Sequence, residues 1–179
     1  MLAANLATAM AQMKDRKVLF IDADLRSTKP RTVFSVQKEN PSPPGLTDFL
    51  RGEIDVRDIL HHTDTPNLFV IPRGGHFSNP LELLHSNQMR KLLSWCRDEG
   101  FHVIIDSPPI LPVTDSMVLA NLVDGVLLVV SAGETTRESC RQSLRRLADS
   151  GGKVLGVVIQ KVHRAQLPSY GYGYTAQHL

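Results

Sequence analysis

The sequence alternates short, almost uninterrupted apolar runs with longer stretches whose apolar residues recur at helical spacing. The apolar runs have the length of strands, which we expect at 17–22, 67–72, 101–106, 124–131 and 153–160. Runs without polar alternation are typical of strands buried on both faces of a parallel sheet. Helices or short helical turns are predicted in the other periodic stretches, at 2–14, 46–52, 56–62, 79–100, 114–123 and 135–152.

This alternation predicts an α/β fold with a mostly parallel sheet and helices on both of its faces. A chain of 179 residues can bury a full hydrophobic core as one domain, which we place at 1–162. Residues 163–179 are rich in Tyr, Gly, Gln and Ser, and we expect them to form a flexible, tyrosine-containing tail.

Composition narrows the function classes without choosing among them. The formal charge of +2 and the lack of a Lys/Arg block argue against a nucleic-acid partner. No apolar run reaches transmembrane length and no signal peptide is recognisable, so we expect a cytoplasmic protein that is at most peripheral to a membrane. The two cysteines, Cys96 and Cys140, lack metal-site spacing and are predicted to be free thiols.

Charged residues follow two of the predicted strands at their carboxyl ends. The segment KVLFIDADLR (17–26) closes with Asp22, Asp24 and Arg26, and FHVIID places Asp106 at the end of another strand. The carboxyl ends of parallel strands form one edge of the sheet, where α/β folds bind their ligands. Three carboxylates there suit Mg²⁺, which takes few direct protein ligands and is completed by substrate phosphates. The alternative is that Asp22 and Asp106 only cap the turns that follow them.

Other polar residues near these motifs have less specific interpretations. Arg26 could bind phosphate or pair with Asp24, and the residues alone leave both possibilities open. Asp115, in PVTDS, is predicted to be a helix N-cap rather than a catalytic group. His61 and His62 are predicted to be surface residues because no matching ligand spacing accompanies them.

Segments along the whole chain form a recognisable combination of motifs. They are VLFIDADLRSTKP, GLTDFLRGE, NLFVIPRGG, NPLELLHSNQMRKLL, FHVIIDSPPILPVTDS, DGVLLVVSAGETTRES, GKVLGVVIQKV and the tail motif SYGYGY. In this order they resemble the catalytic domain of the bacterial tyrosine autokinases of the capsular and exopolysaccharide family, a branch of the P-loop ATPases. The first segment is similar to the family's Walker A′ motif, the fifth to its Walker B strand, and the last to its tyrosine cluster.

The resemblance implies that the chain binds ATP and Mg²⁺ and transfers phosphate to tyrosine. Asp22 would be the base that takes the proton of the tyrosine hydroxyl, and Asp24 and Asp106 would position Mg²⁺ directly or through water. Arg26 and Gln160 are the candidate ATP-binding residues, Gln160 through a hydrogen bond to adenine. These roles follow from the resemblance and not from spacing alone.

The resemblance also implies partners. Tyr170, Tyr172 and Tyr174 would be phosphate acceptors presented to a neighbouring subunit, so that copies self-associate through the tail. A membrane chain-length regulator of polysaccharide export would activate the kinase. The chain would then lie at the inner face of the bacterial cell membrane, held there by this partner or by a lost upstream segment. The alternative for the tail is a disordered segment without such a role.

One motif of that family is missing from this sequence. A phosphate-binding loop, GxxxxGK[ST], is expected between a first strand and the helix at 2–14, and no such segment occurs in the chain. We therefore expect Met1 to be an internal methionine of a truncated domain that lacks its first strand and phosphate loop. Because this loop supplies the donors that neutralise the phosphates, we predict weak or no kinase activity.

Two alternative functions are left open. Partitioning and cell-division ATPases share the DxD pattern and the parallel sheet, although nothing in their function requires the tyrosine cluster. A degenerate NTPase fold could also serve as a docking module without enzymatic activity.

Overall fold

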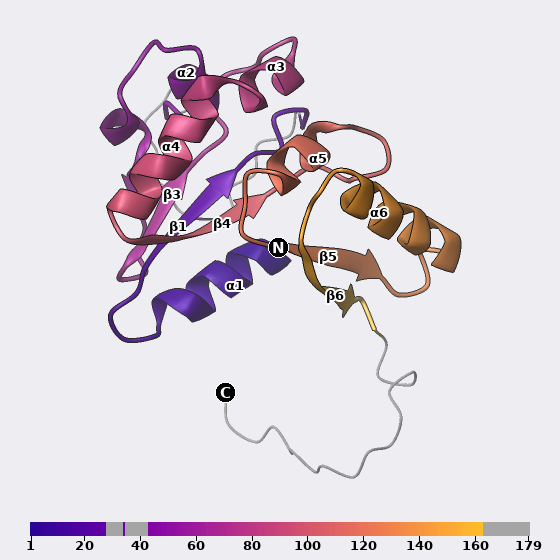
Figure 1. The fold of residues 1–179 in the computed structure, drawn as a ribbon. Helices are drawn as coiled ribbons and strands as arrows, with labels where there is room; N and C mark the ends of the chain where they lie inside the picture. Colours follow the sequence, from indigo (N-terminus) through magenta and orange to yellow (C-terminus); the bar gives the residue numbers. More distant parts are fainter. Residues whose placement is uncertain (28–33, 35–42, 163–179) are drawn as a thin grey trace.

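Three parallel strands form the centre of the fold (Figure 1). The computed structural model describes residues 1–27, 34 and 43–162. β1 (Lys17–Asp22) lies between β3 (Leu68–Ile71) and β4 (Phe101–Asp106) and pairs with both in parallel. The short β2 (His61–His62) pairs with β3 in the antiparallel direction, so the strand order of this sheet is β2-β3-β1-β4.

The other two strands form a second, smaller sheet. β5 (Val126–Ser131) and β6 (Val154–Gln160) pair with each other in parallel. Within the described part of the chain, no β ladder joins either of them to β4. The predicted α/β fold with mostly parallel strands is confirmed, and the structure adds that these strands are divided between two sheets.

Helices cover both faces of the four-stranded sheet, as predicted. α1 (Leu2–Ala11) packs through its alanines on the face that contains Phe20 of β1. α4 (Asn87–Asp98) lies on the opposite face, in the same core cluster as Ile21 (Figure 1). Because side chains alternate along a strand, the apolar run of β1 places buried residues on both faces.

The described residues form further helices beside α1 and α4. They are α2 (Leu46–Leu50), the 3-10 helix η1 (Val56–Ile59), α3 (Pro80–Leu84), α5 (Asp115–Ala120) and α6 (Arg137–Asp149). α3 packs against α5, and α6 packs against both α5 and β6. Helix α5 therefore links the layer above the four-stranded sheet to the two-stranded sheet (Figure 1).

The stretch predicted as one helix at 79–100 forms two helices instead. The first is α3, and a new helix, α4, begins after Ser86. The Ser86 hydroxyl accepts a hydrogen bond from the Met89 amide at 3.3 Å and thus caps α4. A local side-chain cap therefore interrupts a stretch whose apolar spacing is continuous.

The helical turn predicted at 56–62 ends early, because His61 and His62 pair with β3 as strand β2. His62 is exposed, as predicted for a surface residue. His61 is half-buried, and its Nε2 lies 2.9 Å from the carbonyl oxygen of Pro44.

Two further observations concern the thiols and the membrane. Cys96 is buried in α4 and Cys140 is half-buried in α6, and both are free thiols, as predicted. Of the helices in the described residues, none is both long enough and apolar enough to cross a bilayer.

Candidate functional site

The predicted meeting of two strand ends is the centre of the candidate site. Asp22 and Asp106 are register partners at the carboxyl ends of β1 and β4. Partners on adjacent parallel strands point to the same face and lie about 4.8 Å apart along the sheet. The pairing continues one residue further, because the Ala23 amide donates to the Asp106 carbonyl oxygen at 2.8 Å. The structure therefore brings both aspartates to one edge, as the sequence predicted.

The loop after β1 folds tightly around its own carboxylates. The Asp24 amide donates to Asp22 Oδ1 at 3.2 Å, and the Ser27 amide donates to the Asp24 carbonyl oxygen at 3.2 Å. Asp22 and Asp24 are each only 7% exposed. We call residues 22–27 the acidic loop; it holds two carboxylates near a third on β4.

Arg73, directly after β3 and Pro72, supports the acidic loop from one side. Its Nη1 donates to the carbonyl oxygen of Asp24 at 3.3 Å and also to that of Ser27. The backbone of Arg73 is itself fixed, because the Thr47 hydroxyl donates to its carbonyl oxygen at 2.5 Å and to that of Gly75 at 2.9 Å. Sequence reasoning missed this arginine, although a polar residue after an apolar run was a usable signal.

Arg26 supports the acidic loop from the other side, through a contact that corrects the prediction made for Asp115. Its Nε and Nη2 donate to the two carboxylate oxygens of Asp115 at 2.7 and 2.8 Å. The carboxylate that pairs with Arg26 is therefore Asp115, where the sequence offered Asp24, and binding of phosphate by Arg26 stays a prediction. The helix N-cap is Thr114, so the prediction that Asp115 is an N-cap is wrong. Asp115 is fully buried, and the bidentate guanidinium supplies the charged partner that a buried carboxylate requires.

The charge of Arg26 is reinforced by this contact. The hydrogen bond to Asp115 raises the pKa of the Arg26 guanidinium, and the negative charge of that carboxylate acts in the same direction. The guanidinium therefore stays protonated and remains available as the partner of the Asp115 carboxylate.

Ser116, the neighbour of Asp115, holds the loop that follows β4. Its hydroxyl donates to the Pro108 carbonyl oxygen at 2.5 Å, and its side chain is buried. The first turn of α5 thus contacts both loops that carry the candidate carboxylates.

The remaining predicted site residues lie elsewhere. Gln160 ends β6 in the two-stranded sheet, where its Nε2 donates to the Ser131 hydroxyl at 3.1 Å. Tyr170, Tyr172 and Tyr174 fall outside the described residues.

The donor set is suited to a hard divalent cation. Among the described residues, no cluster of three or more His, Cys, Asp or Glu side chains is arranged to hold a metal unaided. Two carboxylates from adjacent strand ends fit Mg²⁺, which commonly takes one or two protein carboxylates and completes its shell with water and phosphate oxygens. The site therefore fits Mg²⁺ whose remaining ligands are water or phosphate oxygens.

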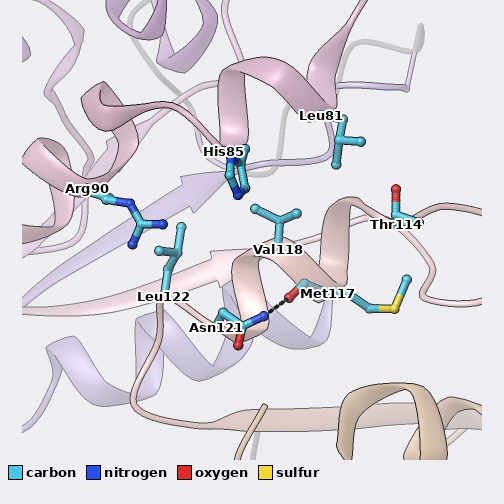
Figure 2. Close-up of a pocket in the computed structure, with 8 residues that line it drawn as sticks. All are labelled: Leu81, His85, Arg90, Thr114, Met117, Val118, Asn121 and Leu122. Carbon is cyan, nitrogen blue, oxygen red and sulfur yellow. Dashed lines mark hydrogen bonds between the residues drawn. The ribbon is translucent and has the colours of Figure 1, made fainter. Parts of the chain in front are cut away.

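A groove on the other side of α5 contains none of these residues. It has a volume of about 510 Å³, and its lining residues are Leu81, His85, Arg90, Thr114, Met117, Val118, Asn121 and Leu122. Figure 2 shows its walls, with Leu81, His85 and Arg90 facing Val118 and Leu122 of the α5 segment. Most of the surface that lines it is apolar, and no aspartate or glutamate is among its lining residues.

The sequence comparisons agree with this geometry. The profile of the AAA domain family matches residues 1–157. The tyrosine-protein kinase ptk of Acinetobacter johnsonii is 38% identical over 171 residues, which make up 96% of this chain and 22% of that protein. The tyrosine-protein kinase CpsD of Streptococcus agalactiae serotype III is 35% identical over 167 residues, which cover 93% of this chain and 70% of CpsD. The chain thus spans about a fifth of the first relative and most of the second.

Solved structures show the same architecture. The kinase domain of the Escherichia coli tyrosine kinase ETK superposes with a TM-score of 0.83 at 36% identity, covering 97% of this chain and 66% of that one. The cell division ATPase MinD of Pyrococcus furiosus superposes with a TM-score of 0.69 over 94% of this chain and 69% of MinD. At 24% identity, the likeness to MinD shows the fold alone. The family profile and the identity with kinases establish that this chain belongs to the bacterial tyrosine autokinases of the P-loop ATPase family.

Proposed function

We propose that this chain is the catalytic part of an ATP- and Mg²⁺-dependent protein-tyrosine autokinase that regulates capsular or exopolysaccharide synthesis or export. The observation that carries the proposal is the register pairing of Asp22 with Asp106, with Asp24 buried in the adjoining acidic loop. Phosphoryl transfer requires mainly positioning and charge neutralisation, which paired carboxylates supply through a bound cation. The tyrosine-kinase names of the relatives support the same activity.

Each carboxylate is assigned one role in the transfer. Asp22 accepts the proton of the acceptor tyrosine hydroxyl, whose oxygen forms the new bond to phosphorus as the bond to ADP breaks. Asp24 and Asp106 hold Mg²⁺, which when bound neutralises charge on the phosphates. The acceptors are Tyr170, Tyr172 and Tyr174 of a neighbouring copy.

We further propose that the 179-residue chain alone has little or no activity. The sequence contains no GxxxxGK[ST] segment to donate several amides and a lysine to the phosphates. One feature partly compensates: five residues separate α1 from β1, and α1 packs along this strand, so its amino end points toward the carboxyl ends of the strands. Met1 makes no side-chain cap there, so the first-turn amides of α1 can attract phosphate, but they do not replace the lysine and the amides of a phosphate loop.

Metal binding provides the direct test of the site. We expect the purified chain to bind one Mn²⁺, measured by electron paramagnetic resonance, and Asp106→Asn and Asp24→Asn each to weaken binding by roughly tenfold or more. Asp124→Asn, at an exposed aspartate, is the matched control and should leave the affinity unchanged. Equal Mn²⁺ affinity in all four proteins would contradict the assignment.

Phosphorylation assays test the function. With Mg²⁺ and ATP, the chain alone should form no phosphotyrosine detectable by mass spectrometry. Adding the ETK kinase domain should place phosphate on at least one of Tyr170, Tyr172 and Tyr174, and substituting all three by Phe should abolish this signal. Phosphotyrosine formed by the chain alone would contradict the proposed inactivity while supporting the kinase assignment. A chain with no phosphorylated tail and no saturable binding of labelled ATP would instead be a docking module.

The cellular setting is part of the proposal. A membrane chain-length regulator is the proposed activating partner, which would hold the domain at the inner face of the cell membrane. Self-association through the tyrosine tail would bring acceptor and site together. Co-purification with such a regulator, lost when the regulator's cytoplasmic segment is deleted, is the expected result.

A further inference from the structure

The first turn of α5 contacts both carboxylate-bearing loops through buried polar side chains. Asp115 is 0% exposed and Ser116 is 8% exposed. Asp115 accepts two hydrogen bonds from Arg26 in the acidic loop, and Ser116 donates to Pro108 in the loop after Asp106. Two consecutive residues therefore connect to both halves of the candidate site.

The geometry of the Arg26–Asp115 pair restrains orientation as well as distance. A bidentate guanidinium–carboxylate contact fixes the plane of both groups, which a single lysine contact would not do. Arg26 is two residues from Asp24 in the tight turn closed by the Ser27 amide. Holding the guanidinium in place therefore restrains the backbone that carries Asp24.

The two side chains of the Arg26–Asp115 pair differ in burial. Asp115 has no access to water, so its negative charge depends on a partner within the protein. Arg26 is 41% exposed and could otherwise extend into solvent. The buried carboxylate is thus the fixed end of the pair, and the acidic loop is the end that is held.

We propose that Asp115 is a positioning residue, which acts through Arg26 to hold the acidic loop against the strand end that carries Asp106. The consequence for divalent-cation binding rests on the function proposed above; the restraint on the loop does not. Arg73 supports the loop through its backbone carbonyl groups, so the two arginines hold it from different elements. The loop is therefore not expected to unfold when one of the two contacts is lost.

The test compares four variants of the full chain. Asp115→Asn removes the buried negative charge, and Arg26→Gln removes its partner. The double variant removes both groups. Arg26→Lys keeps the positive charge but cannot form the bidentate contact. Lys161→Gln is the matched control, because the Lys161–Glu134 ion pair at 2.8 Å is exposed and lies after β6. Thermal unfolding verifies that each variant folds. The double variant keeps the test valid if a lone buried charge prevents Arg26→Gln from folding.

Amide hydrogen exchange measures how firmly the acidic loop is held, and it needs no ligand. We expect the Asp24 and Ser27 amides to exchange roughly tenfold faster in Asp115→Asn and in the double variant, with Arg26→Lys intermediate. Amides 18–21 of β1 should be unchanged in every variant, and the control should match the original chain. Unchanged exchange at Asp24 and Ser27 would overturn the proposal.

Mn²⁺ titration separates positioning from a purely structural role. If the proposal holds, the affinity falls by roughly tenfold in Asp115→Asn, although Asp115 is not a ligand, and the double variant loses no more than either single one. Faster loop exchange with the same Mn²⁺ affinity in all variants would overturn the positioning role. If the original chain binds no Mn²⁺, the proposed metal site fails, and faster exchange confined to the acidic loop would still support Asp115 as the residue that holds it.

Discussion

The four-stranded and the two-stranded sheets differ sharply in how their apolar residues are covered. In β1, Ile21 is 0% exposed and Phe20 is 2% exposed, although they point to opposite faces. In the small sheet, Val129 is 40% exposed and Val157 is 44% exposed. Leu128 pairs with Val157 and Val129 pairs with Val158, so the exposed residues of β5 and β6 also lie on opposite faces. Strand β1 is thus covered on both faces, whereas the small sheet exposes apolar side chains on both of its faces.

This contrast explains where the candidate site lies. Carboxylates can be held in place only if the strands that carry them are rigid, and β1 is enclosed by two neighbouring strands and two helical layers. The small sheet is connected to that body through α5 and α6. Arg146 of α6 donates to the Leu111 carbonyl oxygen at 2.6 Å, in the segment just before α5. The candidate carboxylates accordingly gather on the better-packed sheet.

The largest expected effect compares the same substitution in both sheets. Ile21→Ala should lower the free energy of unfolding by about 4 kcal/mol, because a fully buried side chain leaves a cavity. Ile159→Ala, at a residue that is 61% exposed, should cost about 0.5 kcal/mol. Urea unfolding of both variants measures the difference. Similar losses would show that the small sheet is buried as deeply in solution as β1.

The next largest difference in the free energy of unfolding is expected between alanine substitutions of two glycines, one beside the backbone of Arg73 and one in the small sheet. A Cβ at Gly45 would lie 2.3 Å from the Pro72 carbonyl oxygen, so Gly45→Ala must push apart the backbone that holds Arg73. We expect a loss of about 2–3 kcal/mol. Gly156→Ala in β6 meets nothing closer than Leu127 Cδ2 at 4.0 Å and should stabilise by about 0.5 kcal/mol. Denaturant midpoints of both variants test this, and a neutral Gly45→Ala would contradict the close packing.

These two parts also differ in how well sequence analysis anticipated them. Continuous apolar runs predicted the five longer strands of the described residues, and the position of Asp22 and Asp106 at strand ends predicted their meeting. Both follow from local patterns and the parallel arrangement. The division into two sheets was not predicted, since β5 and β6 are as apolar as the central strands. Hydrophobicity alone does not tell which strands become neighbours.

The ion pair of Arg26 was missed for a different reason. Arg26 and Asp115 are 89 residues apart, and their contact depends on how α5 lies over the strand ends. Nothing near Asp115 distinguishes a helix cap from the buried partner of a distant arginine. The break between α3 and α4 had a local signal, Ser86, but the apolar spacing of 79–100 outweighed it.

The thiols provide a smaller, pH-dependent contrast. Burial raises the pKa of Cys96 to about 12, well above that of a thiol in the unfolded chain. The folded state therefore holds this proton more tightly, so the stabilisation is complete below about pH 8.5 and decreases as the pH rises toward 12, by up to about 1.4 kcal/mol per pH unit. Urea unfolding at pH 8 and 10 should show this loss, and Cys96→Ala should remove it. Cys140→Ala, in the less covered part, should leave the loss unchanged.

The smallest effect on stability, and the sharpest test of the comparison, concerns the exposed apolar residues of the small sheet. Val129→Thr and Val157→Thr keep the β-branched shape while making one residue on each face polar. We expect each to change the free energy of unfolding by no more than about 0.5 kcal/mol, because neither side chain is buried. Exposed apolar patches promote association, so the double variant should show less self-association in sedimentation experiments and less binding of an apolar dye.

Val18→Thr, at a fully buried position, is the matched control and should destabilise without reducing association. A large loss of stability in Val129→Thr or Val157→Thr would mean that these faces are covered in solution, and the contrast between the two sheets would then not hold.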